Sequence, residues 1–125
     1  MEKALILFAH GARDPEWARP VQAVAQRLQR QNPDLTVAVA FLEFMAPTLP
    51  EAVAMLAHQT QGLTQIDILP FFIAQGGHLR QDVPLMLEAI QREHSGLSLR
   101  LLPALGELPS VQDAMAAAIS RLLSA

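Results

Sequence analysis

Four short apolar stretches, each followed by a longer segment with helical spacing, constrain the fold of this chain more than any other feature of its sequence. The stretches are rich in Ile, Val, Leu and Phe and occupy residues 4–9, 35–42, 66–73 and 97–102. They are almost continuously apolar, whereas a strand with one face in water alternates apolar and polar residues. We therefore predict four strands that are covered by helices on both faces.

Signals for the start of a helix follow the first two predicted strands. Asp14 precedes Pro15, which is typical of a capping carboxylate before a first helical turn. Thr48 and Glu51 have the spacing of a capping box, in which each side chain bonds to the backbone of the other residue. Both segments then continue with apolar residues at helical spacing, so each is predicted to be a helix with one buried face.

The two later segments give similar signals. Asp82 and Pro84 predict the start of a third helix, and Ser110 predicts the start of a fourth. The fourth segment is expected to bury one apolar stripe, which consists of Val111, Met115, Ala118 and Leu122.

Strand and helix alternate four times, which predicts right-handed crossovers and an α/β fold with a doubly wound parallel sheet. The expected strand order is 2-1-3-4, in one domain over residues 1–125. Ligands of such sheets bind outside the carboxyl ends of the strands, where the chain reverses direction between the first and third strands. We find no convincing internal repeat.

Composition excludes several classes of site and partner. The chain has no cysteine, so disulfides and thiolate metal sites are excluded, and histidine and carboxylate are the strong metal ligands that remain. The net charge of −3 argues against nucleic acid as a partner. No stretch approaches the roughly 20 apolar residues that cross a bilayer, so we expect a cytoplasmic protein without a membrane partner.

Three polar residues distant in sequence are predicted to meet at the carboxyl edge of the sheet. His10 ends the first predicted strand, Glu43 follows the second, and His78 follows the third. Two imidazoles and one carboxylate suit a divalent first-row metal and leave open positions for another ligand. The three residues are thus candidate metal ligands and catalytic groups.

Each of them also has a plain structural interpretation, which the sequence leaves open. His10 could simply be a polar residue that leaves the core, and His78 could be a loop residue or an imperfect helix cap. Glu43, between apolar neighbours, could be a solvated carboxylate at a strand edge rather than a desolvated acid. Gly11 favours a function for His10, because glycine permits a close approach of the backbone to a ligand.

Two arginines and two apolar residues lie near the same edge. Arg13 and Arg80 are each within three residues of one of the two histidines, and such cations would suit a ligand that carries carboxylates. Met45 and Phe72 are most simply part of the core or the wall of a pocket.

The segments "HGARDP", "FLEFMAPTLPEA" and "LPFFIAQGGHLRQDVP" together resemble the small sirohydrochlorin chelatases of the CbiX and SirB type. That family inserts a divalent metal into sirohydrochlorin without ATP, on the route to cobalamin (cobalt) or sirohaem (iron). The resemblance implies that His10 and His78 handle the metal and that Glu43 completes the site. Ala12 stands where relatives often carry serine, which weakens any role for a hydroxyl there.

The resemblance also implies a substrate, partners and a binding surface. Cobalt, iron or nickel would be the metal substrate, with no organic cofactor, and the sequence does not select among them. Two copies would pair as a homodimer with the cleft between them. The residues expected to bind the tetrapyrrole are Gly11, Arg13, Met45, Phe72, Gly76, Gly77 and Arg80.

Two other functions stay open at this stage. A non-catalytic carrier of metal or tetrapyrrole would use the same ligands. A phosphatase with a histidine nucleophile also has a strand that ends in His-Gly, but those enzymes need an arginine directly before the histidine, and here that residue is Ala9. No glycine-rich phosphate loop with its lysine is present, so the sequence does not support a nucleotide-driven reaction.

Overall fold

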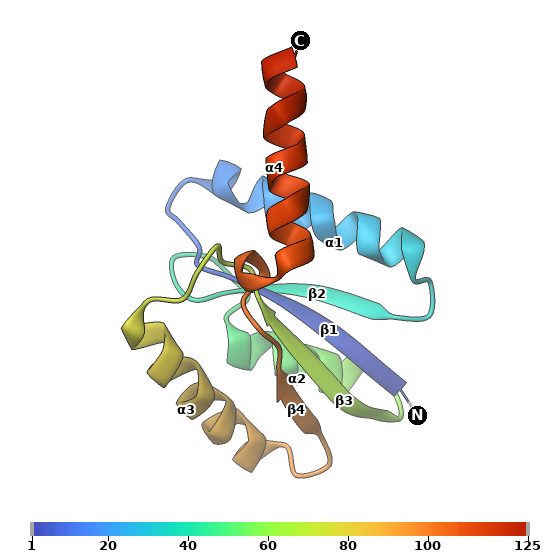
Figure 1. Cartoon of the computed structure of the whole chain (residues 1–125). Helices are drawn as coiled ribbons and strands as arrows, with labels where there is room; N and C mark the ends of the chain where they lie inside the picture. The colour runs from blue at the N-terminus through green and yellow to red at the C-terminus, as the bar shows by residue number, and fades with distance from the viewer. Residues whose placement is uncertain (1, 125) are drawn as a thin grey trace.

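The computed structural model describes residues 2–124. Its four parallel strands form one sheet in the order β2-β1-β3-β4 (Figure 1). The strands are β1 (Glu2–Ala9), β2 (Thr36–Phe41), β3 (Leu63–Pro70) and β4 (Ser98–Leu101). The predicted doubly wound class and the predicted strand order are confirmed. The central strands β1 and β3 each pair with a strand on both sides, and β2 and β4 are the edge strands.

A helix follows each strand, and all of these helices except the last lie in layers on the sheet (Figure 1). The elements are the short 3-10 helix η1 (Pro15–Ala18), α1 (Arg19–Gln31), α2 (Leu49–Gln59), α3 (Gly77–Glu93), the 3-10 turn η2 (Leu105–Glu107) and α4 (Pro109–Ser124). α1 covers one face of the sheet, called here the α1 face. α2 and α3 cover the opposite face, called here the α2/α3 face.

The core consists of two apolar layers, one on each face of the sheet. Ile6 and Phe8 of β1 are fully buried on the α2/α3 face, where they belong to the same cluster as Val83 of α3. Leu7 is fully buried on the α1 face beside Val21 of α1. Successive residues of β1 therefore enter opposite layers, which explains why the strand is apolar without alternation.

The two predicted caps are present. The Asp14 carboxylate accepts a hydrogen bond from the Glu16 amide at 3.0 Å and starts η1, which leads into α1. Thr48 and Glu51 form the predicted capping box at the start of α2. The hydrogen bond from the Thr48 backbone amide lowers the pKa of the Glu51 carboxyl below its usual value.

Two predicted boundaries around the third strand are wrong. β3 runs from Leu63 to Pro70, so the apolar residues 71–73 lie in a loop beyond the sheet. α3 begins at Gly77 with Gly76 as its cap, well before Asp82, and Pro84 lies inside the helix. Pro84 lacks the N–H that an interior helical residue donates, yet the apolar face of α3 packs on the sheet and keeps the helix intact.

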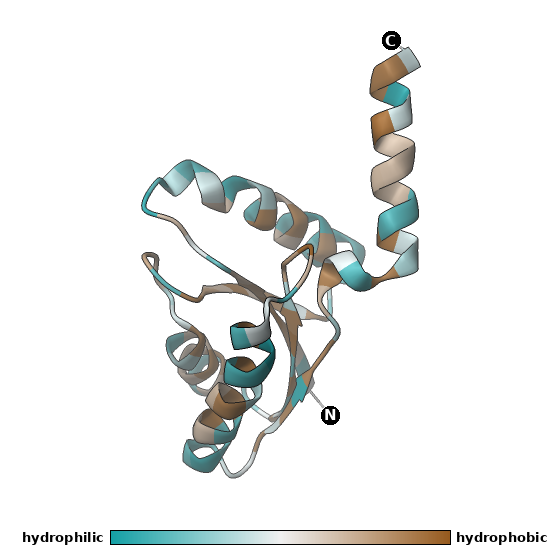
Figure 2. Cartoon of the chain, turned by 60° about the vertical axis from the view of Figure 1, so that its left-hand side comes forward, coloured by the Kyte–Doolittle hydropathy of each residue, from teal (hydrophilic) through white to brown (hydrophobic). Residues whose placement is uncertain are grey.

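α4 does not pack on the sheet, contrary to the prediction. No residue of α4 within the described chain is buried, and the expected stripe is open, with Met115 36% exposed and Leu122 76% exposed. Figure 2 shows α4 standing away from the body, with apolar residues along it. The predicted helix therefore exists, but the buried face predicted for it is not buried within one chain.

An internal repeat, which is not evident from the sequence, is visible in the hydrogen bonds. At the end of α1, the Gln29 side chain accepts a hydrogen bond from the Val37 amide of β2 at 3.1 Å. At the end of α3, Gln91 accepts one from the Leu99 amide of β4, also at 3.1 Å. Each glutamine also donates to the carbonyl two residues before that amide. The unit β1-α1-β2 thus recurs as β3-α3-β4.

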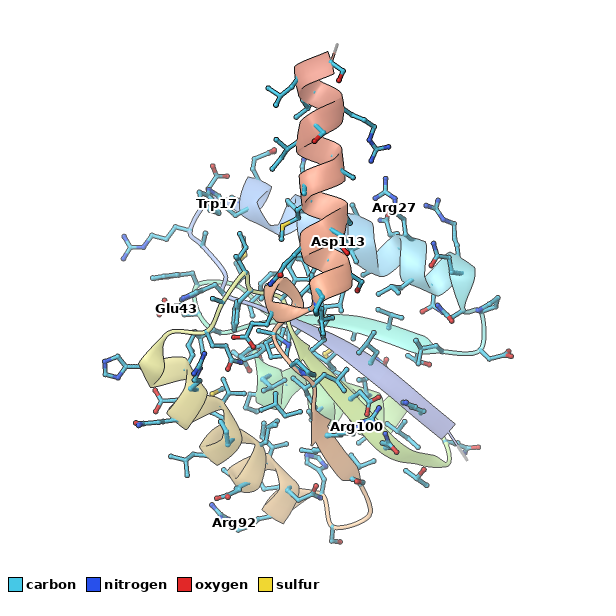
Figure 3. The ribbon with its side chains drawn as sticks, viewed as in Figure 1. Trp17, Arg27, Glu43, Arg92, Arg100 and Asp113 are labelled. Atoms are coloured by element: carbon cyan, nitrogen blue, oxygen red, sulfur yellow. The ribbon has the colours of Figure 1, made fainter. Side chains whose placement is uncertain are left out.

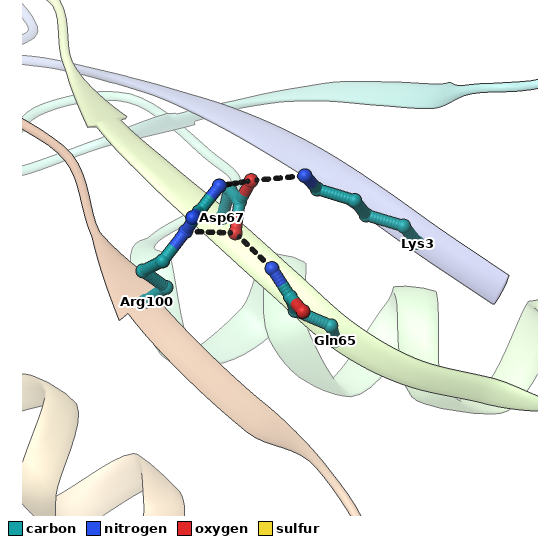
Figure 4. Close-up of polar contacts among 4 residues, drawn as sticks. All are labelled: Lys3, Gln65, Asp67 and Arg100. Atoms are coloured by element: carbon teal, nitrogen blue, oxygen red, sulfur yellow. Dashed lines mark hydrogen bonds and ion pairs between the residues drawn. The ribbon is translucent and has the colours of Figure 1, made fainter. Parts of the chain in front are cut away.

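Among the residues whose burial the structure describes, the α1 face carries one buried charge. Asp67 of β3 is 3% exposed and accepts hydrogen bonds from Arg100, Gln65 and Lys3, at 2.7 to 3.0 Å (Figure 4). Burial alone raises the pKa of this carboxyl, but the hydrogen bonds from these three residues outweigh it and lower the pKa to about 2. Asp67 therefore stays ionised under a cover of side chains.

Candidate functional site

His10 and Glu43 meet at the carboxyl edge of the sheet, as predicted. Beyond the ends of β1 and β2 the two chains stay paired, because the Leu42 amide donates to the Ala9 carbonyl at 2.9 Å and the Glu43 amide to the His10 carbonyl at 3.2 Å. These bonds hold the two loops side by side. Figure 3 shows Glu43 among the loops at this edge.

The two side chains face each other at a distance that leaves both available. His10 Nδ1 lies 4.0 Å from Glu43 Oε1, and the side chains are 58% and 51% exposed. A separation of 4.0 Å is too long for a direct hydrogen bond. The imidazole and the carboxylate can therefore both bind a third atom, such as a metal ion or a proton donor.

Gly11 permits a close contact between the two loops. It has φ +89°, and a Cβ atom there would lie 2.0 Å from the carbonyl oxygen of Glu43. The close approach expected at Gly11 exists, but the group that comes close is the backbone of the second loop. The absence of a side chain at Gly11 thus permits the spacing between His10 and Glu43.

Aromatic rings form the surroundings of this pair. The Phe72 ring lies edge-on to the His10 imidazole, with centroids 5.7 Å apart, so the predicted wall residue does contact the site. Phe44, which was not among the residues predicted from the sequence, is exposed and has φ 68°. The guanidinium of Arg13 lies 5.1 Å from the centroid of its ring, within the range of a cation–π contact.

Two of the open grooves beside the second loop contain predicted site residues. One, of about 600 Å³, is lined by Leu42, Glu43, Leu79, Asp82, Leu85 and Met86. The other, of about 410 Å³, is lined by Arg13, Pro15, Ala18, Gln22, Phe41, Phe44, Met45 and Ala46. Both grooves combine apolar walls with charged groups. Arg13 and Met45, two of the predicted substrate residues, therefore share one groove, while Glu43 belongs to the other.

His78 does not join the pair in this structure. Within residues 2–124, no three His, Asp or Glu side chains lie together so that they could hold a metal ion. The reason is the early end of β3 at Pro70, after which a loop leads to His78 in the first, exposed turn of α3. A side chain at Gly76 or Gly77 would meet no heavy atom within 4 Å, so this turn is open on its outer side.

Arg80 has a partner of its own. Its Nη2 atom lies 3.5 Å from Glu107 Oε1 in η2, and both side chains are substantially exposed. An exposed pair of this kind contributes little to stability and exchanges readily. Arg80 is thus placed at the edge, but toward η2 rather than toward His10.

No helix within residues 2–124 is long and apolar enough to cross a membrane.

Comparison with known sequences gives a consistent set of relatives. The family model CbiX matches residues 4–122. A sirohydrochlorin cobaltochelatase of Methanococcus aeolicus is 33% identical over 91 residues, which are 73% of this chain and 62% of that protein. A sirohydrochlorin cobaltochelatase of Methanopyrus kandleri is 36% identical over 84 residues, 67% of this chain and 57% of that protein. The chain spans about three fifths of the length of these curated relatives.

Solved structures share the fold. The crystal structure of a CbiX protein of Marinobacter aquaeolei VT8, whose name refers to cobalamin (vitamin B12) biosynthesis, has a TM-score of 0.85 and 30% identity, with 98% of both chains covered. SirB of Bacillus subtilis subspecies spizizenii, solved in complex with cobalt, has a TM-score of 0.80 at 18% identity. That match covers 97% of this chain and 51% of SirB, so the similarity extends over half of the larger protein.

Proposed function

This chain belongs to the CbiX family, and from that premise we propose that it inserts a divalent metal ion into sirohydrochlorin without ATP. The metal, cobalt or iron, is a substrate, and the reaction uses no organic cofactor. Relatives named sirohydrochlorin cobaltochelatase support the tetrapyrrole substrate, and the structures of SirB with cobalt and with Fe³⁺ support metal handling in this fold.

The His10–Glu43 pair is the observation that carries the proposal. Insertion requires that a hydrated metal is held weakly enough to be released, and one imidazole with one carboxylate offers such intermediate binding. The macrocycle also loses two pyrrole N–H protons when the metal enters. A neutral imidazole nitrogen can accept a proton, so His10 is a suitable acceptor for them.

His78 is proposed as the third group of this site. It stands at the start of α3, on the same edge of the sheet as His10 and Glu43. A Cβ atom at Gly76 or Gly77 would meet no heavy atom within 4 Å, so this turn leaves open space for a bound macrocycle. Metal binding by His78 would then accompany binding of the tetrapyrrole.

The other edge residues are proposed to bind and orient the macrocycle. Its peripheral carboxylates would pair with Arg13 and with Arg80, which would exchange Glu107 for a substrate carboxylate. The flat apolar ring would lie against Phe72 and Met45. The exposed ring of Phe44 supports Arg13 in this role, since the cation–π contact limits the orientations that the guanidinium can take.

A homodimer is the proposed working form. SirB is about twice as long as the segment that this chain matches, so two copies would supply the second half. The cleft between the copies would then hold the tetrapyrrole. Location in the cytoplasm and the absence of nucleic-acid and membrane partners stay predictions.

The test is anaerobic incubation of the protein with sirohydrochlorin and Co²⁺, Fe²⁺ or Ni²⁺ in turn, without ATP, while the visible spectrum is followed. We expect insertion faster than the uncatalysed rate with at least one metal, over many turnovers. A single stoichiometric spectral change would instead indicate a carrier. No acceleration with any of the three metals would refute the proposal.

A His10→Ala variant tests the role of the pair. Loss of a positioned general base or metal ligand lowers rates by about 10²–10⁴-fold, so the insertion rate should fall within that range while the fold is kept. The matched control is His58→Ala, which removes an exposed imidazole from α2, away from the edge. Equal rates for the two variants would contradict the role assigned to His10.

A further inference from the structure

The two grooves described beside the second loop differ in charge. The groove of about 410 Å³ has one cation, Arg13, and no carboxylate among the described residues that line it. The groove of about 600 Å³ has two carboxylates, Glu43 and Asp82, and no Lys, Arg or His among its described lining residues. We call the second one the acidic groove. The first groove suits an anionic ligand, and the acidic groove suits a cation.

The two carboxylates of the acidic groove come from different elements. Glu43 lies on the loop after β2, and Asp82 lies in the second turn of α3. The other lining residues are apolar, namely Leu42, Leu79, Leu85 and Met86. A cleft with apolar walls and charges of one sign focuses their field, which raises the local concentration of counter-ions.

Asp82 does not start α3, contrary to the prediction from the sequence. The helix begins at Gly77, so Asp82 is too far along it to be a cap. Its carboxylate is exposed and has no hydrogen bond or ion pair with another residue of the described chain. Arg80, two residues before it, pairs instead with Glu107 at 3.5 Å. The charge of Asp82 is therefore available to a ligand in the acidic groove.

The acidic groove is continuous with the His10–Glu43 pair. Glu43 lines the groove, and its Oε1 atom lies 4.0 Å from His10 Nδ1. His78, the proposed third group of the site, lies four residues before Asp82 in α3. Residues four apart are neighbours on one side of a helix. A cation that enters the groove beside Asp82 is therefore close to the groups proposed to bind the metal.

We propose that Asp82 receives the hydrated metal ion and that the acidic groove is the path by which the ion reaches Glu43. The inference rests on the proposed metal insertion and adds to it an entry path and a residue that binds the metal. Asp82 acts through the water shell of the ion, so no covalent bond changes at this step. The carboxylates of the tetrapyrrole bind at Arg13 in the other groove, so the two substrates do not compete for one entrance.

Calorimetric titration of Co²⁺ into the protein without tetrapyrrole tests the role of Asp82. Asp82→Asn removes the charge with little change in size, and Asp82→Glu keeps the charge. The matched control is Glu88→Gln, because Glu88 is an exposed carboxylate of the same helix that lines a different groove.

The expected change in affinity follows from Coulomb's law. One carboxylate at about 6 Å from a divalent ion in water changes its binding by about tenfold. We therefore expect Asp82→Asn to bind Co²⁺ about tenfold more weakly at low salt, and Asp82→Glu and Glu88→Gln to bind it nearly as the wild type does. Equal affinities of Asp82→Asn and Glu88→Gln would overturn the proposal, and so would a wild type that shows no binding of Co²⁺.

Steady-state insertion kinetics distinguish metal entry from a role in the chemical step. Asp82→Asn should raise the KM for the metal by about tenfold and leave kcat and the KM for sirohydrochlorin unchanged. The difference from the wild type should shrink at about 0.5 M salt, because salt screens exposed charges. A purely structural effect would not depend on salt in this way. A lower kcat at an unchanged metal KM would contradict the proposal.

The two experiments separate this inference from the proposed function. A wild type that inserts no metal would refute the insertion reaction. The Co²⁺ titration uses no tetrapyrrole, so it would still decide whether Asp82 binds the ion.

Discussion

Replacing Asp67 by asparagine should destabilise the protein by an amount that depends on pH. The carboxylate is buried and accepts hydrogen bonds from Arg100, Gln65 and Lys3, which lower its pKa to about 2 from an ordinary value of 3.8. Asparagine has nearly the same size as aspartate but no charge. Lys3 and Arg100 would therefore lose their ion pairs with residue 67.

The size of the effect follows from linkage. A carboxyl whose pKa is lowered on folding binds its proton more weakly in the folded state, so it stabilises the folded state wherever it is ionised. The difference between 3.8 and about 2 corresponds to about 2.4 kcal/mol, at about 1.36 kcal/mol per pKa unit. This contribution is fully present above about pH 4 and is lost as the pH falls from there toward 2.

Urea unfolding of the wild type and of Asp67→Asn, from about pH 6 down to about pH 2.5, measures this contribution. Protein concentration must be the same throughout, because association adds a concentration-dependent term to stability. We expect a difference in the free energy of unfolding of about 2 kcal/mol at about pH 6 that shrinks markedly by about pH 2.5. Asp34→Asn, at an exposed carboxylate in the loop before β2, is the control for loss of one negative charge.

One result would refute the reasoning. If Asp67→Asn lowered stability equally at both ends of this pH range, the loss would come from altered packing and not from the ionised carboxylate. A loss no larger than that of Asp34→Asn at the upper end would mean that the cost of burying the charge cancels the gain from its partners.

Two further predictions concern the backbone and the caps. Gly11→Ala should lower stability by more than about 2 kcal/mol and reduce metal insertion, because a Cβ atom there would collide with the Glu43 carbonyl at a positive φ. Thermal unfolding measures it, and Gly96→Ala, where the added Cβ meets no atom within 4 Å, should leave the melting temperature nearly unchanged. Thr48→Ala removes one half of the capping box and should cost about 1 kcal/mol in urea unfolding, whereas Thr48→Ser should retain most of that stability.

The strands and their order could be predicted because the signal is local and repeated. Each strand of a sheet covered on both faces must be apolar at successive positions, and residues such as Ile6, Leu7 and Phe8 show this directly. The capping residues Asp14 and Thr48 mark where helices begin for equally local reasons. The strand order then follows from the general rules for how helices connect parallel strands, without knowledge of any contact between particular residues.

The predictions for residues 71–73 and for the buried face of α4 were wrong because apolar residues there are not part of the sheet or packed on it. The strand ends at Pro70, and residues 71–73 lie beyond it, where the Phe72 ring borders His10 and the Phe72 carbonyl accepts a hydrogen bond from Gly106 of η2. The apolar side of α4 suggests burial, but the sequence does not say whether the covering surface belongs to the same chain. Sequence reasoning of this kind identifies which faces are apolar, not which molecule covers them.

The candidate site was predictable in its residue types and only partly in its geometry. His10 and Glu43 meet because the carboxyl ends of neighbouring parallel strands share one edge. His78 is apart from them because its distance depends on the path of a loop, which no periodic pattern describes. Phe44 was missed since nothing in its sequence context indicates that a bulky residue adopts a positive φ and supports Arg13.

The paired glutamine contacts have a consequence for how this protein avoids aggregation. β2 and β4 are the edges of the sheet, and an edge strand with free N–H and C=O groups is a template for a strand from another molecule. The Gln29 side chain is hydrogen-bonded to one backbone amide and one backbone carbonyl at or just before β2, and Gln91 is bonded in the same way at β4. These backbone groups are therefore not free to pair with an incoming strand. Chains that meet in a crowded solution are thus discouraged from joining sheet to sheet, and association is directed toward the helices.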